Sequence, residues 1–400
     1  PNSLRKTRDA SRHAKEMIVD TLLDRRRFIA RASIALGAAF VPRMAFAAAP
    51  TDKRFIFIIQ RGAADGLNTV VPYADPAYQR LRGALAIEAA KAIRLDGTFA
   101  LHPSLSQIGA MHGDKEALFV HAIASSYRDR SHFDGQNVLE TGGSTPYAIR
   151  DGWLNRLAGL LNGAGEKAIA LTPTIPLALR GSAPVASYSP SRMPEPSDDL
   201  MMQVSELYAA DEQLHSLWSS ALNARAIGES SGDENGAAAL GRLAAAFLAK
   251  PNGPRIAMLE TGGWDTHNAQ TGRLATQLKS LDSLVGALRT SMGSHWSTTT
   301  VLIATEFGRT AAINGTGGTD HGTAAAAILI GGSVIGGRVI ADWPGLATAQ
   351  LHEGRDLKPT CDLGALIAGA AAEAFKLDPA QVARHLFPGS AHRPLVGIVG

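Results

Sequence analysis

Short runs of consecutive apolar residues recur along the chain, separated by longer segments of mixed polarity. They cover residues 55–59, 117–124, 168–171, 256–259, 300–304 and 324–330. The runs lack the alternation of apolar and polar positions that a half-exposed strand shows. Unbroken runs of this length are typical of strands that are buried on both faces of a sheet. We therefore expect these segments to form the central strands of the fold.

Helical patterns lie between the runs. The clearest ends before Pro251, and its apolar residues recur at intervals of three and four positions: Leu240, Leu243, Ala244, Phe247 and Leu248. This spacing places the apolar side chains on one face of a helix. Strands that alternate with helices predict an α/β fold, in which a mostly parallel sheet carries helices on both faces.

Residues 182–236 depart from this alternation. Serine and proline crowd residues 182–197, a helical stretch follows to about Ala226, and a polar, glycine-containing segment covers 228–236. We interpret the region as an inserted helix between two loops. Two hypotheses remain open for it, a cap over the functional site and a surface insertion without a role. The rest of residues 48–400 fits a single large domain.

The N-terminal segment has the three parts of an export signal. Arginines at 25–27 precede an apolar run at 32–41, and Ala45-Phe46-Ala47 follows as a candidate cleavage site. The apolar run is too short for the roughly 20 residues that a membrane-spanning helix needs. Consecutive arginines before Phe-Ile resemble a twin-arginine signal, and a Sec signal is the alternative. We expect Met17 to be the start, residues 1–47 to be a removed leader, and the mature protein to be periplasmic or secreted without a stable membrane span.

Composition and charge narrow the class of protein. The 400 residues are 45% hydrophobic and 19% charged, which excludes a disordered chain. The net charge of +3 suggests a nucleic-acid partner at first, but residues 1–47 hold ten basic and four acidic side chains. The remainder has 29 basic and 32 acidic side chains, a net charge of −3, so we expect no nucleic-acid binding. The single cysteine, Cys361, rules out an internal disulfide.

Polar clusters directly follow the apolar runs. Ligands of open α/β sheets bind beyond the carboxyl ends of the strands, so these clusters are the candidate site. The first cluster, residues 60–68, contains Asp65, a candidate cation ligand. An Asp-Gly turn that contacts no ligand explains this residue as well.

The second cluster, residues 127–136, holds Ser131 between Arg130 and His132, with Arg128 nearby. Ser131 and Asp134 are close to a capping box, and helix capping alone is one interpretation. The other is that a hydroxyl at a helix N-terminus, beside two arginines, meets a phosphate or sulfate group and acts as a nucleophile. His132 is a further candidate ligand or base.

Two later clusters each contain an aspartate and a histidine. Asp265 and His267 follow the run at 256–259, and residues two apart in an extended segment point to the same side, so both can bind one ion. Asp320 and His321 lie in a glycine-rich segment after the run at 300–304. Mixed carboxylate and imidazole ligands suit zinc or manganese, and a pair of such ions can hold the attacking and leaving oxygens of a displacement. The sequence thus predicts a site for one or two divalent ions.

Other motifs are absent from the sequence or have simpler explanations. It contains no phosphate-binding P-loop, no dinucleotide-binding glycine motif and no serine-hydrolase elbow, so those enzyme classes lose support. His352 and Asp356 are further candidate ligands, but turn formation accounts for them more simply.

Seven segments together carry a family resemblance: residues 61–68, 130–134, 151–156, 263–267, 306–310, 318–322 and 354–357. In this order they resemble the domain-of-unknown-function 1501 family, twin-arginine-exported bacterial proteins of the alkaline-phosphatase-like superfamily. The resemblance implies a three-layer αβα sandwich and two metal ions at the strand ends. It also implies a nucleophile at Ser131 and metal ligands at Asp65, Asp265, His267, Asp320 and His321.

From these observations we expect an exported metal-dependent hydrolase that acts on a small anionic ester of phosphate or sulfate. Ser131 or a metal-bound water would be the nucleophile, and Arg128, Arg130 or Arg309 would stabilise the anion. These motifs specify neither the substrate nor the oligomeric state. The alternative is a non-catalytic envelope protein that retains the fold and binds a partner or polymer.

Overall fold

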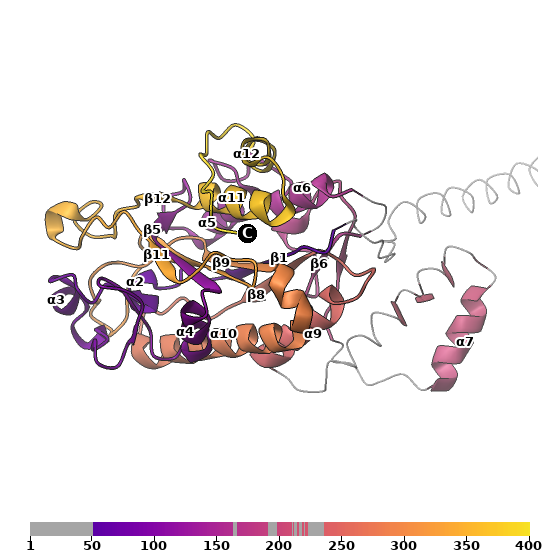
Figure 1. Ribbon diagram of the computed structural model, residues 1–400, viewed down its shortest axis with the longest axis horizontal. Coiled ribbons are helices and arrows are strands. Elements are labelled where there is room, and N and C mark those ends of the chain that lie inside the picture. Colours follow the sequence, from indigo (N-terminus) through magenta and orange to yellow (C-terminus); the bar gives the residue numbers. More distant parts are fainter. Residues whose placement is uncertain are drawn as a thin grey trace, which may run out of the picture. The chain divides into compact units, whose positions relative to one another are not determined.

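A computed structural model describes residues 51–162, 166–190, 198–209, 211, 214–215, 218–219, 221–222 and 236–400 (Figure 1). The described residues all belong to one compact unit, Met44–Gly400. The expected leader, residues 1–47, lies outside the described residues, and so does much of the expected insertion at 182–236.

A large sheet forms the centre of this unit. Its strands lie in the order β11-β5-β10-β9-β1-β8-β6-β7, and β12 pairs with β5. All described neighbours pair in parallel except β10, which is antiparallel to β5 and β9. The strands are β1 Arg54–Gln60, β5 Ala117–Ala124, β6 Ala168–Ala170, β7 Val185–Ser187, β8 Ile256–Thr261, β9 Thr299–Thr305, β10 Ala325–Ile330, β11 Arg338–Ile340 and β12 Cys361–Asp362. The predicted mostly parallel sheet is confirmed.

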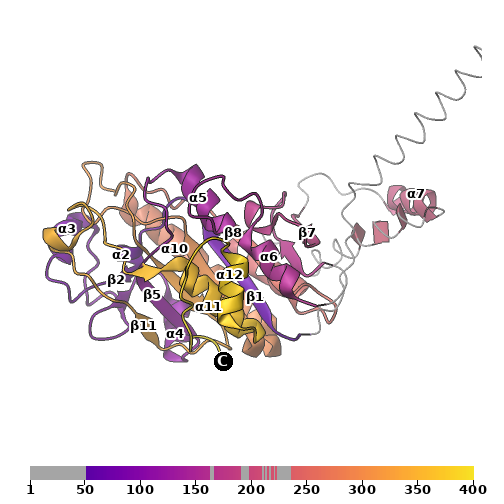
Figure 2. The same ribbon diagram turned by 90° about the horizontal axis from the view of Figure 1, so that it is seen from above.

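Helices cover both faces of this sheet, because its central strands are apolar on both sides. In β1, Phe55, Phe57 and Ile59 belong to one hydrophobic core, and Ile56 and Ile58 belong to another. The first core contains residues of α5 His132–Thr141, α6 Trp153–Leu160, α11 Leu363–Phe375 and α12 Pro379–Leu386. The second contains residues of α4 Ser106–Gly113, α9 Ala237–Leu248 and α10 Gln270–Met292. Figures 1 and 2 show the two helical layers on opposite sides of the sheet, which confirms the three-layer αβα sandwich.

Smaller elements complete the described fold. A second sheet has the order β2-β4-β3, formed by Val70–Val71, Ala100–Leu101 and Ile93–Arg94. The remaining helices are α2 Gly66–Thr69, α3 Tyr78–Arg82, α7 Asp198–Ala209 and the 3-10 turns Gly83–Leu85, Leu177–Leu179, Gly293–Thr298 and Thr348–Gln350. None of the described helices has the length and apolar character needed to cross a membrane.

All six apolar runs form strands, and the helix predicted around residues 240–248 is α9. The expected insertion differs at its start, because β7 lies inside residues 182–236 and pairs with β6 at the edge of the sheet. This strand is only three residues long and half-buried at both ends, so it lacks the unbroken apolar run of the central strands. The middle of the region contains α7, in agreement with the predicted helix.

The strand directions bring the polar clusters together. Gln60, the last residue of β1, is in register with Thr261 at the end of β8 and Thr305 at the end of β9. Because β10 is antiparallel, its first residue, Ala325, lies toward the same edge. The loops that follow β1, β8 and β9, and the loop that precedes β10, therefore meet at one edge of the sheet.

Candidate metal centre

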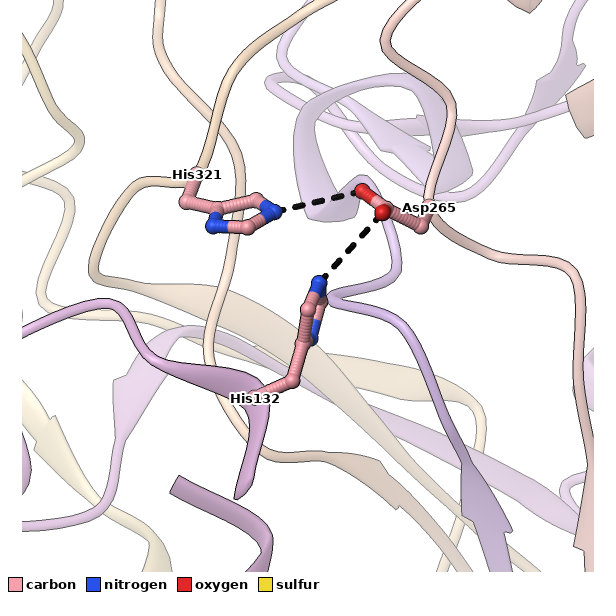
Figure 3. Close-up of side chains that lie close together, drawn as sticks. All are labelled: His132, Asp265 and His321. Carbon is pink, nitrogen blue, oxygen red and sulfur yellow. Dashed lines mark hydrogen bonds and ion pairs between the residues drawn. The ribbon is translucent and has the colours of Figure 1, made fainter. Parts of the chain in front are cut away.

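Three side chains from three loops converge at this edge. His132 begins α5, Asp265 follows β8, and His321 precedes β10. A ligand atom of each lies within 4.8 Å of a ligand atom of both others, the single group of this kind among the described residues. Figure 3 shows both imidazole rings directed at the Asp265 carboxylate. His132, which the sequence offered only as a further candidate, is thus a central member of the group.

His267 joins the same cluster. Its Nε2 atom lies 3.0 Å from Oδ1 of Asp265 and 3.0 Å from Nε2 of His321. The Nε2 atom of His321 is 3.2 Å from the same Asp265 oxygen, and Nε2 of His132 is 3.5 Å from Oδ2. Three imidazole Nε2 atoms therefore surround one carboxylate.

The opposite ring nitrogens determine which tautomer each histidine adopts. Nδ1 of His132 lies 2.8 Å from Oε1 of Glu306, and Nδ1 of His267 lies 3.0 Å from Oδ1 of Asp320. Nδ1 of His321 lies 2.9 Å from the carbonyl oxygen of Arg130. Carboxylate and carbonyl oxygens only accept hydrogen bonds, so each Nδ1 carries the proton. In the neutral rings, each Nε2 then presents a lone pair to the centre of the cluster.

This donor set fits a zinc ion. Ligands at about 2.1 Å from a tetrahedral zinc lie about 3.4 Å apart, close to the 3.2 and 3.5 Å that separate the Asp265 oxygens from Nε2 of His321 and Nε2 of His132. Nε2 of His132 is buried and has no hydrogen-bond partner among the described residues, so its lone pair is available to a cation. Imidazole nitrogens suit zinc, whereas manganese prefers ligand sets rich in oxygen. Three imidazoles and one carboxylate therefore favour zinc over manganese.

Two glycines allow the loops to approach this closely. A Cβ atom on Gly62 would lie 2.7 Å from the amide nitrogen of Asp265, and one on Gly318 would lie 2.3 Å from the carbonyl carbon of His267. Gly62 also has a φ of +119°, which disfavours any other residue. Gly62 in the loop after β1 and Gly318 in the loop before β10 thus allow both loops to lie against the backbone of the loop that carries Asp265 and His267.

The charges around the cluster favour a cation. The hydrogen bond to Glu306 raises the pKa of His132, while burial and the neighbouring His132 lower the pKa of His321. Burial alone would raise the pKa of Asp265, but the hydrogen bond from Arg309 and the nearby charges of Arg309, His267 and His132 together lower this pKa. The Asp265 carboxylate therefore remains ionised, and the neutral form of the His321 ring is favoured beside it.

Glu306 is a functional residue that the sequence did not single out. Its side chain is fully buried, and Oε1 accepts from the Gly62 amide at 2.8 Å and from Gln136 at 3.1 Å in addition to His132. Burial would raise the pKa of Glu306, but the hydrogen bonds, led by that of His132, lower it overall. Two signals were available, the position of Glu306 immediately after a buried strand and its place at the start of the segment 306–310.

Asp65 is not part of the cluster. Its two oxygens pair with the Arg82 guanidinium at 2.7 and 2.8 Å, and Oδ1 also accepts from the amides of Leu67 and Asn68 at the start of α2. Oδ2 accepts from Gln270 at 2.5 Å. Asp65 and Arg82 are at most 1% exposed, so this carboxylate is occupied by a buried ion pair and a helix cap.

The three arginines considered for anion binding contact other protein groups. Arg128 donates to the carbonyl oxygens of Ser125 and Tyr127. Arg130 forms ion pairs with Asp356 and Glu353. Arg309 is buried, donates to Asp265 at 2.6 Å and also contacts Thr319. Their described contacts hold loops together, and among the three guanidinium groups only that of Arg309 contacts a side chain of the cluster.

Ser131 occupies the N-cap position of α5, adjacent to His132. Its backbone is extended, but its hydroxyl accepts no capping hydrogen bond from the helix. The capping interpretation therefore does not account for this side chain. Its position is at the positive end of a ten-residue helix, where an anionic group is stabilised.

Asp320 lies beside the cluster. Its carboxylate contacts Nδ1 of His267 and accepts from Asn314, and the His267 hydrogen bond lowers the pKa of Asp320. His352 and Asp356, the weaker candidates, pair with each other through the backbone, and Asp356 is held by Arg130.

One family matches the sequence. Its sequence model, described as "Protein of unknown function (DUF1501)", matches residues 52–387. No curated protein matches the sequence.

Several solved structures are similar at low identity. The C-terminal periplasmic domain of EcEptC from Escherichia coli, in complex with Zn, is 9% identical with a TM-score of 0.36, covering 73% of this chain and 76% of that chain. The lipoteichoic acid synthase LtaP from Listeria monocytogenes is 10% identical with a TM-score of 0.36, covering 75% and 69%. A putative sulfatase from Bacteroides thetaiotaomicron is 8% identical with a TM-score of 0.37, covering 86% and 76%.

Proposed function

Because the chain belongs to the DUF1501 family, whose description assigns no function, its activity must be inferred from the site, and we propose a zinc-dependent hydrolase of phosphate or sulfate esters. His132, Asp265, His267 and His321 would hold the ion. The observation that carries the proposal is the orientation of the three histidines, each with Nδ1 against an acceptor oxygen and Nε2 turned to Asp265. Metal-binding histidines are typically fixed in this way.

The proposal assigns Glu306 and Asp320 a positioning role. Glu306 holds the ring of His132, and Asp320 holds the ring of His267. Asp65, expected from the resemblance to be a ligand, is left out of the ligand set because Arg82 and Gln270 occupy its oxygens. Without Asp65, the proposed ligands within the described part of the chain would hold one ion rather than two.

The site is open to substrate. The side chains of Asp265 and His267 are 43% and 41% exposed, and those of His132 and His321 are about a quarter exposed. A bound zinc ion would neutralise the charge that develops on the ester group during the displacement. An oxygen of the anionic group would also lie at the N-terminus of α5, where the helix dipole and free amides stabilise it.

Ser131 is the nucleophile in this proposal. Its oxygen would form the new bond to phosphorus or sulfur while the bond from that atom to the ester oxygen breaks, and the alcohol would leave with the proton that the serine loses. Water would then attack the phosphorus or sulfur, return a proton to the serine and release the anion. Direct attack by water is the second route that the site allows, and the Ser131 variant described below separates the two. We retain the expectation of export, which rests on the arginines at 25–27.

A panel of esters tests the function. We expect the zinc-loaded protein to hydrolyse at least one aryl phosphate or sulfate, and we expect removal of zinc with a chelator to abolish turnover and added zinc to restore it. Release of the aryl alcohol, followed by absorbance, is the measurement. A zinc-loaded protein that is inert on phosphate monoesters, phosphate diesters and sulfate esters alike would instead favour a binding protein of the cell envelope.

A further inference from the structure

We infer that a buried chain of hydrogen bonds behind the metal centre positions the Asp265 carboxylate for metal binding. Its members are Asp65, Gln270, Thr319 and Arg309, which we call the relay. Each is at most 1% exposed. The inference rests on the proposed function, since it assigns these residues a role toward the ion that Asp265 would bind.

The relay is continuous. Gln270, the first residue of α10, donates from Nε2 to Oδ2 of Asp65 at 2.5 Å, and its Oε1 accepts from the Thr319 hydroxyl at 2.6 Å. The Thr319 hydroxyl oxygen accepts from Nε of Arg309 at 3.2 Å. Arg309 then donates from Nη1 to Oδ1 of Asp265 at 2.6 Å. Four successive hydrogen bonds thus link a carboxylate in the interior to the carboxylate of the metal centre.

The Asp65 carboxylate determines which atom donates in each hydrogen bond of the relay. Asp65 only accepts, so the Gln270 amide must turn its NH₂ group toward Asp65 and its oxygen toward Thr319. Thr319 has one hydroxyl proton and gives it to Gln270, which leaves the hydroxyl oxygen to accept from Arg309. If one of these side chains turned round, two buried donors or two buried acceptors would face each other. Such unpaired polar groups are costly in the protein interior.

This order of donors and acceptors holds the Asp265 carboxylate in one orientation. Arg309 is held at Nε by Thr319, and its Nη2 contacts the Thr319 carbonyl, so the guanidinium cannot turn away from Oδ1 of Asp265. Oδ2 then faces His132. Outer-shell partners that orient a ligand typically contribute about 10- to 100-fold to metal affinity. The relay gives Asp65 a role toward the metal centre although it lies away from that centre.

Thr319→Val tests the relay, because valine has nearly the shape of threonine and lacks the hydroxyl. We expect zinc affinity, measured in the metal-free protein by competition with a chromophoric chelator, to fall by about 10- to 100-fold, and Thr319→Ser to restore it to within about threefold. The matched control is Thr300→Val. Thr300 is equally buried and bonds Ser333 at 2.8 Å, but it lies near the opposite end of β9 from the metal centre.

The outcomes are distinct. The relay is overturned if the Thr319→Val protein binds zinc as tightly as the Thr300→Val protein. It is also overturned if the zinc affinity of Thr319→Ser is as low as that of Thr319→Val. If valine prevents folding, Thr319→Ala and Thr319→Ser compare the same hydroxyl in smaller side chains, and equal zinc affinity of that pair overturns the inference. A wild type that binds no zinc overturns the metal centre itself, and the relay with it.

Discussion

Replacing Asp265 with asparagine should abolish tight zinc binding and, with it, turnover. We expect zinc affinity to fall by at least about 100-fold, because a direct ligand contributes more than the outer-shell partners that are worth 10- to 100-fold. Asp265 is the carboxylate that all three histidine Nε2 atoms surround. Asparagine retains an oxygen for the hydrogen bond from Arg309, so the side-chain position is preserved while the charge is lost. Chelator competition measures the affinity, and release of the aryl alcohol measures turnover.

Asp134→Asn is the matched control for Asp265→Asn. Asp134 lies in the first turn of α5 and contacts Tyr127 at 3.5 Å, but it is not part of the metal-ligand group. We expect this variant to bind zinc as the wild type does. An Asp265→Asn protein that folds, as judged by circular dichroism, and keeps wild-type zinc affinity would remove Asp265 from the ligand set and contradict the proposed centre.

Ser131→Ala should retain zinc and lose activity. If the serine oxygen attacks the ester, its removal lowers kcat by at least about 1,000-fold, in the range seen when a catalytic nucleophile is deleted. Zinc affinity should remain within about threefold of wild type, since Ser131 is adjacent to a ligand but is not one itself. Stability should change little, because the hydroxyl makes no capping bond to α5.

Ser126→Ala provides the comparison for Ser131→Ala. Ser126 lies in the loop between β5 and α5 and is exposed, so the same substitution should leave both zinc binding and kcat unchanged. If Ser131→Ala keeps kcat within about tenfold of wild type, the serine is not the nucleophile, and direct attack by water replaces it while the metal centre stands.

The sequence predicted the sheet and the edge that carries the site. Unbroken apolar runs such as residues 117–124 are buried on both faces, and burial on both faces is a property of the run itself. The short strands β7, β11 and β12 were not predicted, since they are only two or three residues long and, unlike β6, are not buried throughout. Parallel pairing then determines that the polar loops after β1, β8 and β9 meet.

The roles of individual site residues were harder to predict, because they depend on partners that are distant in the sequence. Asp65 looked like a ligand, but Arg82 and Gln270 surround it in the fold. Conversely, Glu306 was named only as part of the segment 306–310, and its contact with His132 became evident only when β9 placed the two side chains together. Spacing alone indicated that Asp265 and His267 act together, and the structure brings the two side chains together.

The most direct test of the account is a calorimetric titration of the metal-free wild-type protein with zinc. The three oriented histidines and Asp265 predict saturable binding of one zinc ion per chain, and they predict the loss of this binding in His321→Ala. Absence of saturable binding by the folded wild type, or undiminished binding by His321→Ala, would contradict the metal centre from which the proposed hydrolase activity is inferred.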